Sequence, residues 1–433
     1  MRRFAAIAGV ALATAGAAAV VALWWTSAEG TGAAAGPLAE IARLCGLLGA
    51  YLVLIELLLL ARLPLLDRLY GFGNLTAWHR WNGRACVSLL VAHALLIVIA
   101  YARADDRSLP AELVRLIEEF PGVITALAGL VLLIAVVVSS AVIVRRRLRY
   151  ETWYFVHLYA YLAVALAFSH QLATGTAFVG RPLARTFWTA LYVATLVAIV
   201  GFRIALPVAR SLRHRLRVAR VVEEAPGFAS IEIAGTGLDR LGARTGQFFG
   251  WRFLTRDRWW ESHPFSLSAA PEPDRLRITV KGVGDFSGRL RSLTPGTRVI
   301  AEGPFGAFTT AARRRPRVAL IAGGVGITPI RALLEDMPGE PGDITVVYRA
   351  RRPEDVILRA ELDELAGRRG AEVHYVLGGD DALSAERLLT LVPDLTERDV
   401  YLCGSPAMTR ATRASLAHSG VPRRQIVTER FAY

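Results

Sequence analysis

Apolar residues form long runs in the first half of the chain and only short runs in the second half. Six of the long runs have about the length that a helix needs to cross a bilayer, roughly 20 residues. They cover residues 4–25, 37–61, 78–101, 121–144, 153–172 and 185–206. We therefore predict a bundle of six membrane helices. The first run can also be interpreted as a signal peptide that starts at Arg2 and Arg3 and is cleaved near residues 33–35.

The second half of the chain has two further patterns. Short β-rich runs separated by turn residues indicate a small antiparallel barrel. They cover residues 216–222, 230–233, 247–253, 265–268, 276–280 and 298–301. From residue 317, strand and helix patterns alternate, which is typical of a doubly wound parallel sheet. The predicted domains are a helical membrane domain (1–206), a basic linker (207–217), a β-barrel (218–311) and an α/β domain (312–433).

Composition supports this division. Hydrophobic residues make up 53% of the 433 residues and the mean hydropathy is +0.38, which excludes a disordered chain and argues against a purely soluble one. The chain has three cysteines, Cys45, Cys86 and Cys403. Three cysteines exclude a disulfide framework and also an iron–sulfur cluster held by four cysteines of this chain.

The net charge of +14 comes almost entirely from arginine, since Lys281 is the only lysine. Fourteen arginines lie in one alternating set of loops, within residues 2–3, 62–80, 145–149 and 203–217, and five lie in the opposite set. The arginine-rich loops are expected in the cytoplasm, so both termini should lie there in a multi-pass protein of the cell membrane. Because the basic residues follow these loops and lack interleaved aromatics, we expect no nucleic-acid partner.

Four histidines fall inside predicted membrane helices: His79 and His93 in the third, His157 and His170 in the fifth. Ionisable residues in membrane helices are costly and indicate function, although a single histidine can simply bond to a neighbouring helix. Separations of 14 and 13 residues correspond to about 21 Å and about 20 Å along a helix. Two helices with matched histidines suit two bis-histidine b-type haems, one near each membrane face.

The 13-residue separation complicates this prediction. Fourteen residues return to within about 40° of the starting face of a helix, whereas thirteen end about 140° away. The two haems would then meet the fifth helix from different directions, or that helix is bent. The sequence leaves both possibilities open.

Two segments of the predicted barrel suit a flavin. In the segment from His263 to Ser268, an aromatic ring can pack on the isoalloxazine and a neighbouring hydroxyl can bond to its N5/O4 edge. An ordinary strand with a proline bulge would have the same sequence pattern. In KGVGDFSGRL, residues 284–287 can open a short helix whose amides bind a pyrophosphate. We expect FAD at this site.

A glycine-rich turn between a strand and a helix, Gly323 to Thr328, predicts a nucleotide diphosphate site. A second turn, Gly404 to Pro406, follows another strand and should lie at the same sheet edge. Arg349 and Arg351 follow the second strand of the α/β domain, where arginine accommodates a ribose 2′-phosphate. We therefore predict NADPH in preference to NADH, although arginines can also simply solvate a strand end.

These motifs together resemble the ferric reductase/NADPH oxidase superfamily, in which a six-helix haem domain precedes a ferredoxin-reductase-like module. The resemblance implies that His79 with His157 binds the inner haem and His93 with His170 the outer haem. It implies a C-terminal aromatic, Phe431 or else Tyr433, that covers the flavin and gates nicotinamide access. It implies FAD contacts from His263, Pro264, Phe265, Ser266, Ser268, Lys281, Gly284 and Ser287, and nicotinamide-nucleotide contacts from Gly323, Gly324, Gly326, Thr328, Cys403 and Gly404.

The predicted function is electron transfer from cytosolic NAD(P)H through FAD and two haems to an acceptor outside. The first candidate acceptor is a ferric or cupric chelate; the alternatives are oxygen, reduced to superoxide, and a partner protein that the sequence does not identify. Oxygen-reducing relatives tend to carry a further histidine where this chain has Ile97, which argues against an oxidase. Arg43 argues for one, since a cation near the outer haem would stabilise an anionic product, unless it is an interfacial arginine.

Overall fold

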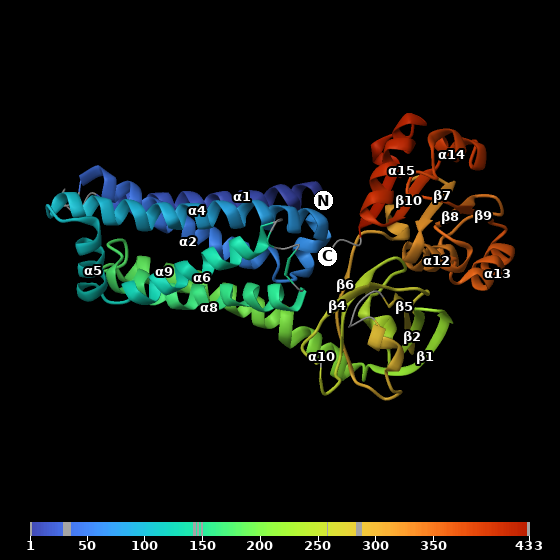
Figure 1. Cartoon of the computed structure of the whole chain (residues 1–433), viewed down its shortest axis with the longest axis horizontal. Helices are drawn as coiled ribbons and strands as arrows, with labels where there is room; N and C mark the ends of the chain where they lie inside the picture. Colours follow the sequence, from blue (N-terminus) through green and yellow to red (C-terminus); the bar gives the residue numbers. More distant parts are fainter. Residues whose placement is uncertain are drawn as a thin grey trace. The chain divides into compact units, whose positions relative to one another are not determined.

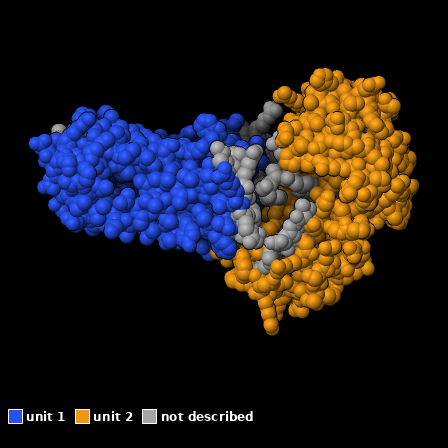
Figure 2. Space-filling view, in the orientation of Figure 1, with its two compact units in different colours: residues 1–202 blue, residues 203–433 orange. Residues whose placement is uncertain are grey.

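The computed structural model describes residues 2–28, 36–141, 144, 147–148, 150–257, 259–282 and 288–430. The chain divides into two compact units, residues 1–202 and 203–433, coloured blue and orange in Figure 2. Each unit is described by itself below.

Among its described residues, the first unit contains six helices that are long and apolar enough to cross a membrane, as predicted (Figure 1). They are α1 (Arg2–Ala28), α2 (Gly36–Leu59), α4 (Phe72–Ala104), α6 (Val123–Ser140), α8 (Tyr150–Thr174) and α9 (Pro182–Val200). The last candidate span runs on through a π-helical turn, Gly201–Ala205, to Arg213. The apolar runs therefore predicted the membrane helices correctly.

Packing within this unit is pairwise. Helix α2 packs along α4, and α6 packs along α8, while α4 and α8 make only sparse backbone contact in the described residues. Gly129 allows the close approach of α6, because a Cβ there would lie 2.7 Å from the Ala163 carbonyl oxygen on α8. Helix α4 is thus held mainly by α2 and helix α8 mainly by α6, which also contacts α4.

Two short helices in the first unit were not predicted. Helix α3 (Pro64–Tyr70) precedes α4, and helix α5 (Leu109–Glu119) lies across one end of the bundle (Figure 1). In α5, Arg115 pairs with Glu112, which is fully buried, and with Asp105 and Glu119. Leu113 and Leu116 of α5 face the interior cavity described below. Leu109, Leu113, Leu116 and Ile117 follow the i, i+4, i+7, i+8 period of an amphipathic helix, so the sequence did carry a signal for α5.

The second unit begins with α10 (Leu206–Arg213), which occupies most of the segment predicted as a linker. Ser211 of α10 accepts a hydrogen bond from the backbone of Ala301. Six antiparallel strands follow in two sheets, ordered β1-β2-β5 and β4-β3-β6. Single bridges, Leu267 to Ile278 and Arg217 to Arg298, join the two sheets into a barrel-like layer. The strands are β1 (Arg217–Ala225), β2 (Phe228–Ala234), β3 (Phe248–Phe253), β4 (His263–Ser266), β5 (Arg275–Lys281) and β6 (Val299–Phe305).

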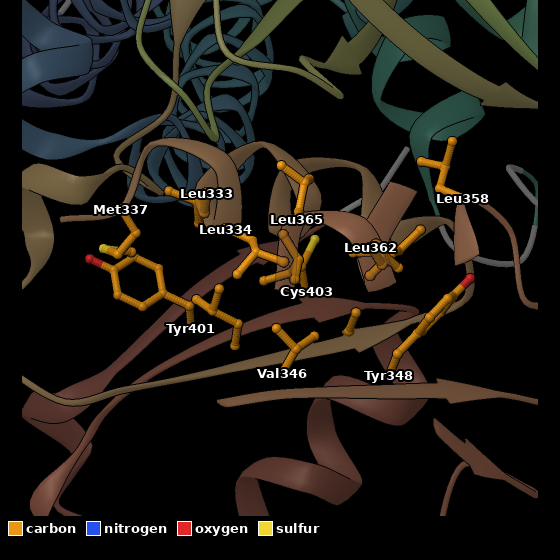
Figure 3. Packing of buried hydrophobic residues seen from close by; sticks show 14 of the residues in the cluster. Leu333, Leu334, Met337, Val346, Tyr348, Leu358, Leu362, Leu365, Tyr401 and Cys403 are labelled. Atoms are coloured by element: carbon orange, nitrogen blue, oxygen red, sulfur yellow. The ribbon is translucent and has the colours of Figure 1, made fainter. Parts of the chain in front are cut away.

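The last part of the chain is a five-stranded parallel sheet in the order β11-β10-β7-β8-β9, as the alternating pattern predicted. Its strands are β7 (Val318–Gly323), β8 (Ile344–Ala350), β9 (Glu372–Leu377), β10 (Asp399–Gly404) and β11 (Ile426–Arg430). The helices are α12 (Ile327–Asp336), α13 (Arg359–Arg369), α14 (Ala385–Leu391) and α15 (Pro406–His418). Leucines of α12 and α13 pack on the sheet around Val346, Tyr348 and Tyr401 (Figure 3).

Candidate functional site

The four membrane histidines form two pairs, one member of each pair on α4 and one on α8. The ring centroids of His79 and His157 lie 5.9 Å apart. Bonds from imidazole nitrogen to a metal ion are about 2.0–2.1 Å long, so two rings on opposite sides of one ion lie roughly 6 Å apart. His93 and His170 line one cavity. Helix α8, which carries His157 and His170, is continuous from Tyr150 to Thr174.

In each of the four histidines, Nδ1 faces a polar atom of the protein. The Nδ1 atoms lie 2.7 Å from Glu56 Oε1 (His79), 2.8 Å from the Ala42 carbonyl oxygen (His93), 3.4 Å from Ser140 Oγ (His157) and 2.9 Å from Thr174 Oγ1 (His170). A histidine that binds a metal through one ring nitrogen usually engages the other in this way, which fixes ring orientation. The arrangement therefore leaves Nε2 of each ring for an iron ion and fits two bis-histidine haems.

The cavity between the outer histidines is apolar and has a volume of about 260 Å³. Leucine, valine and alanine side chains form most of its wall, with Phe120 from the segment after α5 and Trp188 from α9. Gly46 and Gly122 make room for the histidines, because a Cβ there would lie within 3 Å of His93 Nδ1 and His170 Cα. Such a wall excludes water from a flat apolar cofactor.

Arg43 and Ile97 line the same cavity. Arg43 forms an ion pair with Glu40 and donates a hydrogen bond to the Tyr101 hydroxyl at 3.3 Å. The positive charge of Arg43 is therefore largely compensated within the protein. Among the described residues, no group of three or more His, Cys, Asp or Glu side chains is arranged to hold a metal ion, whereas a bis-histidine haem takes only two protein ligands.

The predicted flavin site lies on β4 and its neighbours. The Ser266 side chain is buried, and its Oγ has no hydrogen-bond partner among the described residues. An unpaired buried hydroxyl is costly unless a ligand completes its bonding, so Ser266 fits the edge of a flavin ring. Phe265 is half-buried beside it, and its carbonyl oxygen accepts a hydrogen bond from Trp251. Pro264 pairs with Gly250 of β3.

Other residues predicted at the flavin have different surroundings. Ser268 is fully buried and bonds to Thr279 and Arg277 inside the barrel. His263 lies 3.5 Å from Glu261, and the Lys281 ammonium lies 5.1 Å from the ring centre of Phe228. Two predicted diphosphate contacts, Gly284 and Ser287, lie outside the described residues, as do both C-terminal aromatics, Phe431 and Tyr433.

The two glycine turns of the α/β domain meet at one sheet edge, as predicted from their position after parallel strands. Strands β7 and β10 are adjacent, and Gly404 lies against Gly323, with 3.5 Å between an ideal Cβ on the former and Cα of the latter. A Cβ on Gly326 would lie 2.2 Å from the Cys403 carbonyl oxygen, and one on Gly323 would lie 2.0 Å from Met408 Sδ. Gly324 has a φ of +55°. Thr328 bonds to the Val325 carbonyl oxygen in the first turn of α12.

The Cys403 thiol is fully buried among the apolar residues between the sheet and α12 (Figure 3). Burial, reinforced by the nearby Glu429 carboxylate, raises the pKa of this thiol well above its usual range. Cys403 therefore stays protonated, and its carbonyl oxygen, beside Gly326, is the atom nearest the glycine turn. A nucleophilic role, which requires a thiolate, does not fit this position.

The two arginines predicted to bind a 2′-phosphate differ in exposure. Arg349 is 5% exposed and donates to the Gly379 carbonyl oxygen at 2.9 Å, while the side chain of Arg351 is 70% exposed. Both face Asp380, at 3.2 Å and 3.7 Å. No local sequence pattern indicates Asp380, because it lies in the turn after β9, about 30 residues further along the chain.

Three family models match consecutive parts of the chain. The ferric reductase like transmembrane component matches residues 45–168, the FAD-binding domain matches residues 239–309, and the oxidoreductase NAD-binding domain matches residues 320–414. The chain has the domain architecture of the ferric reductase/NADPH oxidase superfamily. The second unit accordingly matches the FAD- and NAD-binding domains of oxidoreductases.

Curated relatives match about a third of this chain. NADH-cytochrome b5 reductase 1 of Cryptococcus neoformans is 29% identical over 167 residues, which are 34% of this chain and 57% of the relative. The stachydrine N-demethylase reductase subunit of Rhizobium meliloti is 33% identical over 174 residues, 36% of this chain and 49% of the relative. The chain thus spans about half the length of the curated relatives it matches.

Among solved structures, the flavohem-like FAD/NAD-binding domain of nitric oxide dioxygenase from Vibrio cholerae is similar over 50% of this chain and 97% of that chain. The sequence identity is 24% and the TM-score is 0.43.

Proposed function

We propose that this protein transfers electrons from cytosolic NAD(P)H, through FAD and two bis-histidine haems, to a ferric or cupric chelate outside the cell membrane. The observation that carries the proposal is the pairing of the four membrane histidines on α4 and α8, each with a polar atom of the protein within 3.4 Å of Nδ1. The arginine-rich loops support cytoplasmic termini, so that the nucleotide sites lie on the side of the cell where NAD(P)H is found.

The bound FAD would supply hydride acceptance and the haems single-electron transfer. The protein's own residues orient and enclose these groups. Ser266 offers a hydroxyl to the flavin edge, and the turns at Gly323 and Gly404 let backbone amides approach the nucleotide phosphates. The histidine pairs hold iron, and the apolar wall around His93 and His170 excludes water.

The nucleotide is NADPH in this proposal, selected chiefly by Arg351. Its guanidinium is largely exposed at the sheet edge, whereas Arg349 is buried and bonded to the protein. A guanidinium matches phosphate geometry, but the neighbouring Asp380 opposes an added negative charge. We therefore expect a modest preference for NADPH.

Oxygen reduction to superoxide is the second candidate, because a cation, Arg43, lines the outer cavity. Its ion pair with Glu40 and its bond to Tyr101 leave little net positive charge for an anionic product. Ile97, also in the cavity wall, offers no proton donor. Both features favour the chelate over oxygen.

Turnover of the purified full-length protein with NADPH tests this proposal. We expect ferric citrate to be reduced in the presence and absence of oxygen at similar rates, with no inhibition by superoxide dismutase. Ferric reduction that superoxide dismutase abolishes would identify superoxide as the primary product. Failure to reduce either acceptor, with both haems reduced by NADPH, would instead point to a partner protein outside.

A further inference from the structure

Helix α2 supports both candidate haem ligands of α4 at the same spacing. Glu56 and Ala42 are 14 residues apart on α2, as are His79 and His93 on α4. The helices run antiparallel, so Glu56 faces His79 near the start of α4 and Ala42 faces His93 further along. One register therefore gives His79 a carboxylate partner and His93 a backbone carbonyl partner.

The carboxylate of Glu56 is held in place by residues of α2 and α4. Asn82 Nδ2 donates to Glu56 Oε2 and to the Leu52 carbonyl oxygen, both at 2.8 Å. Gly83 leaves room for the carboxylate, since a Cβ there would lie 2.6 Å from Glu56 Oε1. The Glu56 side chain is 14% exposed, and apart from the paired Glu40 and Arg43 it is the charged residue of a largely apolar helix. An acidic group retained at such cost in a membrane helix indicates a function.

The outer pair has different partners. His93 faces a carbonyl oxygen and His170 faces the Thr174 hydroxyl, and both of these groups are uncharged. The nearby Arg43 is compensated by Glu40. At the inner candidate haem position, a carboxylate thus lies beside one of the two ligand imidazoles. At the outer position, both ligand imidazoles have uncharged partners.

We propose that Glu56 lowers the reduction potential of the inner haem below that of the outer haem and so makes outward electron transfer favourable. This inference rests on the proposed function. The Glu56 carboxylate lies 2.7 Å from His79 Nδ1, and its negative charge at that distance favours ferric over ferrous iron. In the step concerned, one electron leaves the inner iron, which becomes ferric, and reduces the outer iron to the ferrous state. No bond or proton changes place.

The test is a spectroscopic redox titration of the full-length protein with its haems, comparing wild type with Glu56→Gln. Glutamine keeps an oxygen acceptor for His79 and removes the charge. We expect the equilibrium constant for transfer from inner to outer haem to fall about tenfold, which is a rise of about 59 mV in the inner potential for one electron. The potential of the outer haem should shift by less than the amount that would change this equilibrium constant twofold.

Two controls use neutral partners. Ser140→Ala removes the hydroxyl near His157 of the inner pair, and Thr174→Ala removes the one near His170 of the outer pair. Each should change the equilibrium constant by less than threefold, since neither removes a charge. The variants His79→Ala and His93→Ala assign each titration step, and each low-spin electron paramagnetic resonance signal, to a haem.

The outcomes separate this inference from the function on which it rests. If the wild-type protein binds fewer than two haems, the proposed function fails. If two haems bind and Glu56→Gln leaves the inner potential unchanged, the role of Glu56 is overturned. If Glu56→Gln loses the inner haem, the titration uses Glu56→Asp instead. This variant moves the carboxylate away from His79 by one methylene, so it should raise the inner potential by less than Glu56→Gln would. An unchanged inner potential in Glu56→Asp would again overturn the inference.

Discussion

The two units of this chain build their candidate cofactor sites by different means. In residues 1–202 the proposed ligands are long polar side chains, held between apolar helices by contacts such as that of His79 with Glu56. In residues 203–433 the nucleotide edge is made largely of backbone, at glycines where no Cβ fits, such as Gly323 and Gly326. The most direct test therefore differs between the units: removal of a ligand imidazole in the first, and addition of a methyl group at the nucleotide edge in the second.

The largest expected effect is the loss of one haem per chain on removal of an imidazole. His79→Ala and His157→Ala should each lower the haem content from two to one and should affect the same haem, because their rings face each other. His93→Ala and His170→Ala should affect the other haem, since both line one cavity. A pyridine haemochrome assay with reduced-minus-oxidised spectra measures this. Loss of both haems in each variant, with the fold intact, would contradict independent pairs.

In the second unit, adding a single methyl group should have the next largest effect. Gly326→Ala would place Cβ 2.2 Å from the Cys403 carbonyl oxygen and 2.9 Å from the Gly404 nitrogen. Because these neighbours are backbone atoms, we expect a loss of about 1–3 kcal/mol in stability and weaker nucleotide binding. Thermal unfolding and nucleotide titration measure both.

Gly367→Ala is the matched control. Gly367 lies in helix α13, and a Cβ there would meet nothing within 4 Å. Alanine is favoured over glycine inside a helix by roughly 0.5–1 kcal/mol, so this variant should be neutral or slightly stabilised. Equal destabilisation by both substitutions would show that the glycine turn is not specially crowded.

The contrast between the units also explains what the sequence could predict. Hydrophobic run length identified the six membrane helices, and the strand–glycine–helix order identified the nucleotide edge, because both are local patterns. Glu56, like the histidines, is an ionisable residue within a predicted span. Its role, however, can be inferred only from its position next to His79 in the structure. Asp380 and the buried position of Cys403 depend on contacts between distant segments, which no local pattern encodes. Helix α5, by contrast, has a regular amphipathic pattern at Leu109, Leu113 and Leu116, so a search for helices shorter than a membrane span would have predicted it.

A smaller effect is expected on nucleotide preference. Asp380 faces Arg351 across 3.7 Å and would repel a 2′-phosphate bound there. Asp380→Asn should raise kcat/KM for NADPH relative to NADH by several-fold, and Arg351→Ala should lower the same ratio. Arg349→Ala should instead reduce stability, because Arg349 is buried and bonds to Gly379. Steady-state kinetics with both nucleotides measure these ratios. An unchanged ratio in both Asp380→Asn and Arg351→Ala would show that this site does not bind the 2′-phosphate of NADPH.

The smallest expected effect concerns an ion-pair cluster between the barrel and the α/β domain. Arg277 of β5 donates two hydrogen bonds to Glu361 of α13, both at 2.8 Å. Arg331 of α12 donates to the same carboxylate at 2.9 Å and pairs with Glu335, which accepts a hydrogen bond from the backbone of Ala270. Burial by itself would raise the pKa of Glu361, but the hydrogen bonds and charges of Arg277 and Arg331 outweigh it and hold the pKa below the ordinary value of 4.5.

A carboxyl group whose pKa is depressed by folding stabilises the protein above its unfolded pKa, and this contribution disappears as pH falls through the folded pKa. We therefore expect Glu361→Gln to lower stability by about 1 kcal/mol at neutral pH, a small value because the carboxylate is about one-third exposed. The difference from wild type should shrink below pH 4.5. Thermal unfolding of the full-length protein from neutral pH to about pH 3.5 measures it. Glu364→Gln, on the same helix but exposed, should match wild type throughout. A difference for Glu361→Gln that stays constant with pH would show that its effect comes from packing and not from charge.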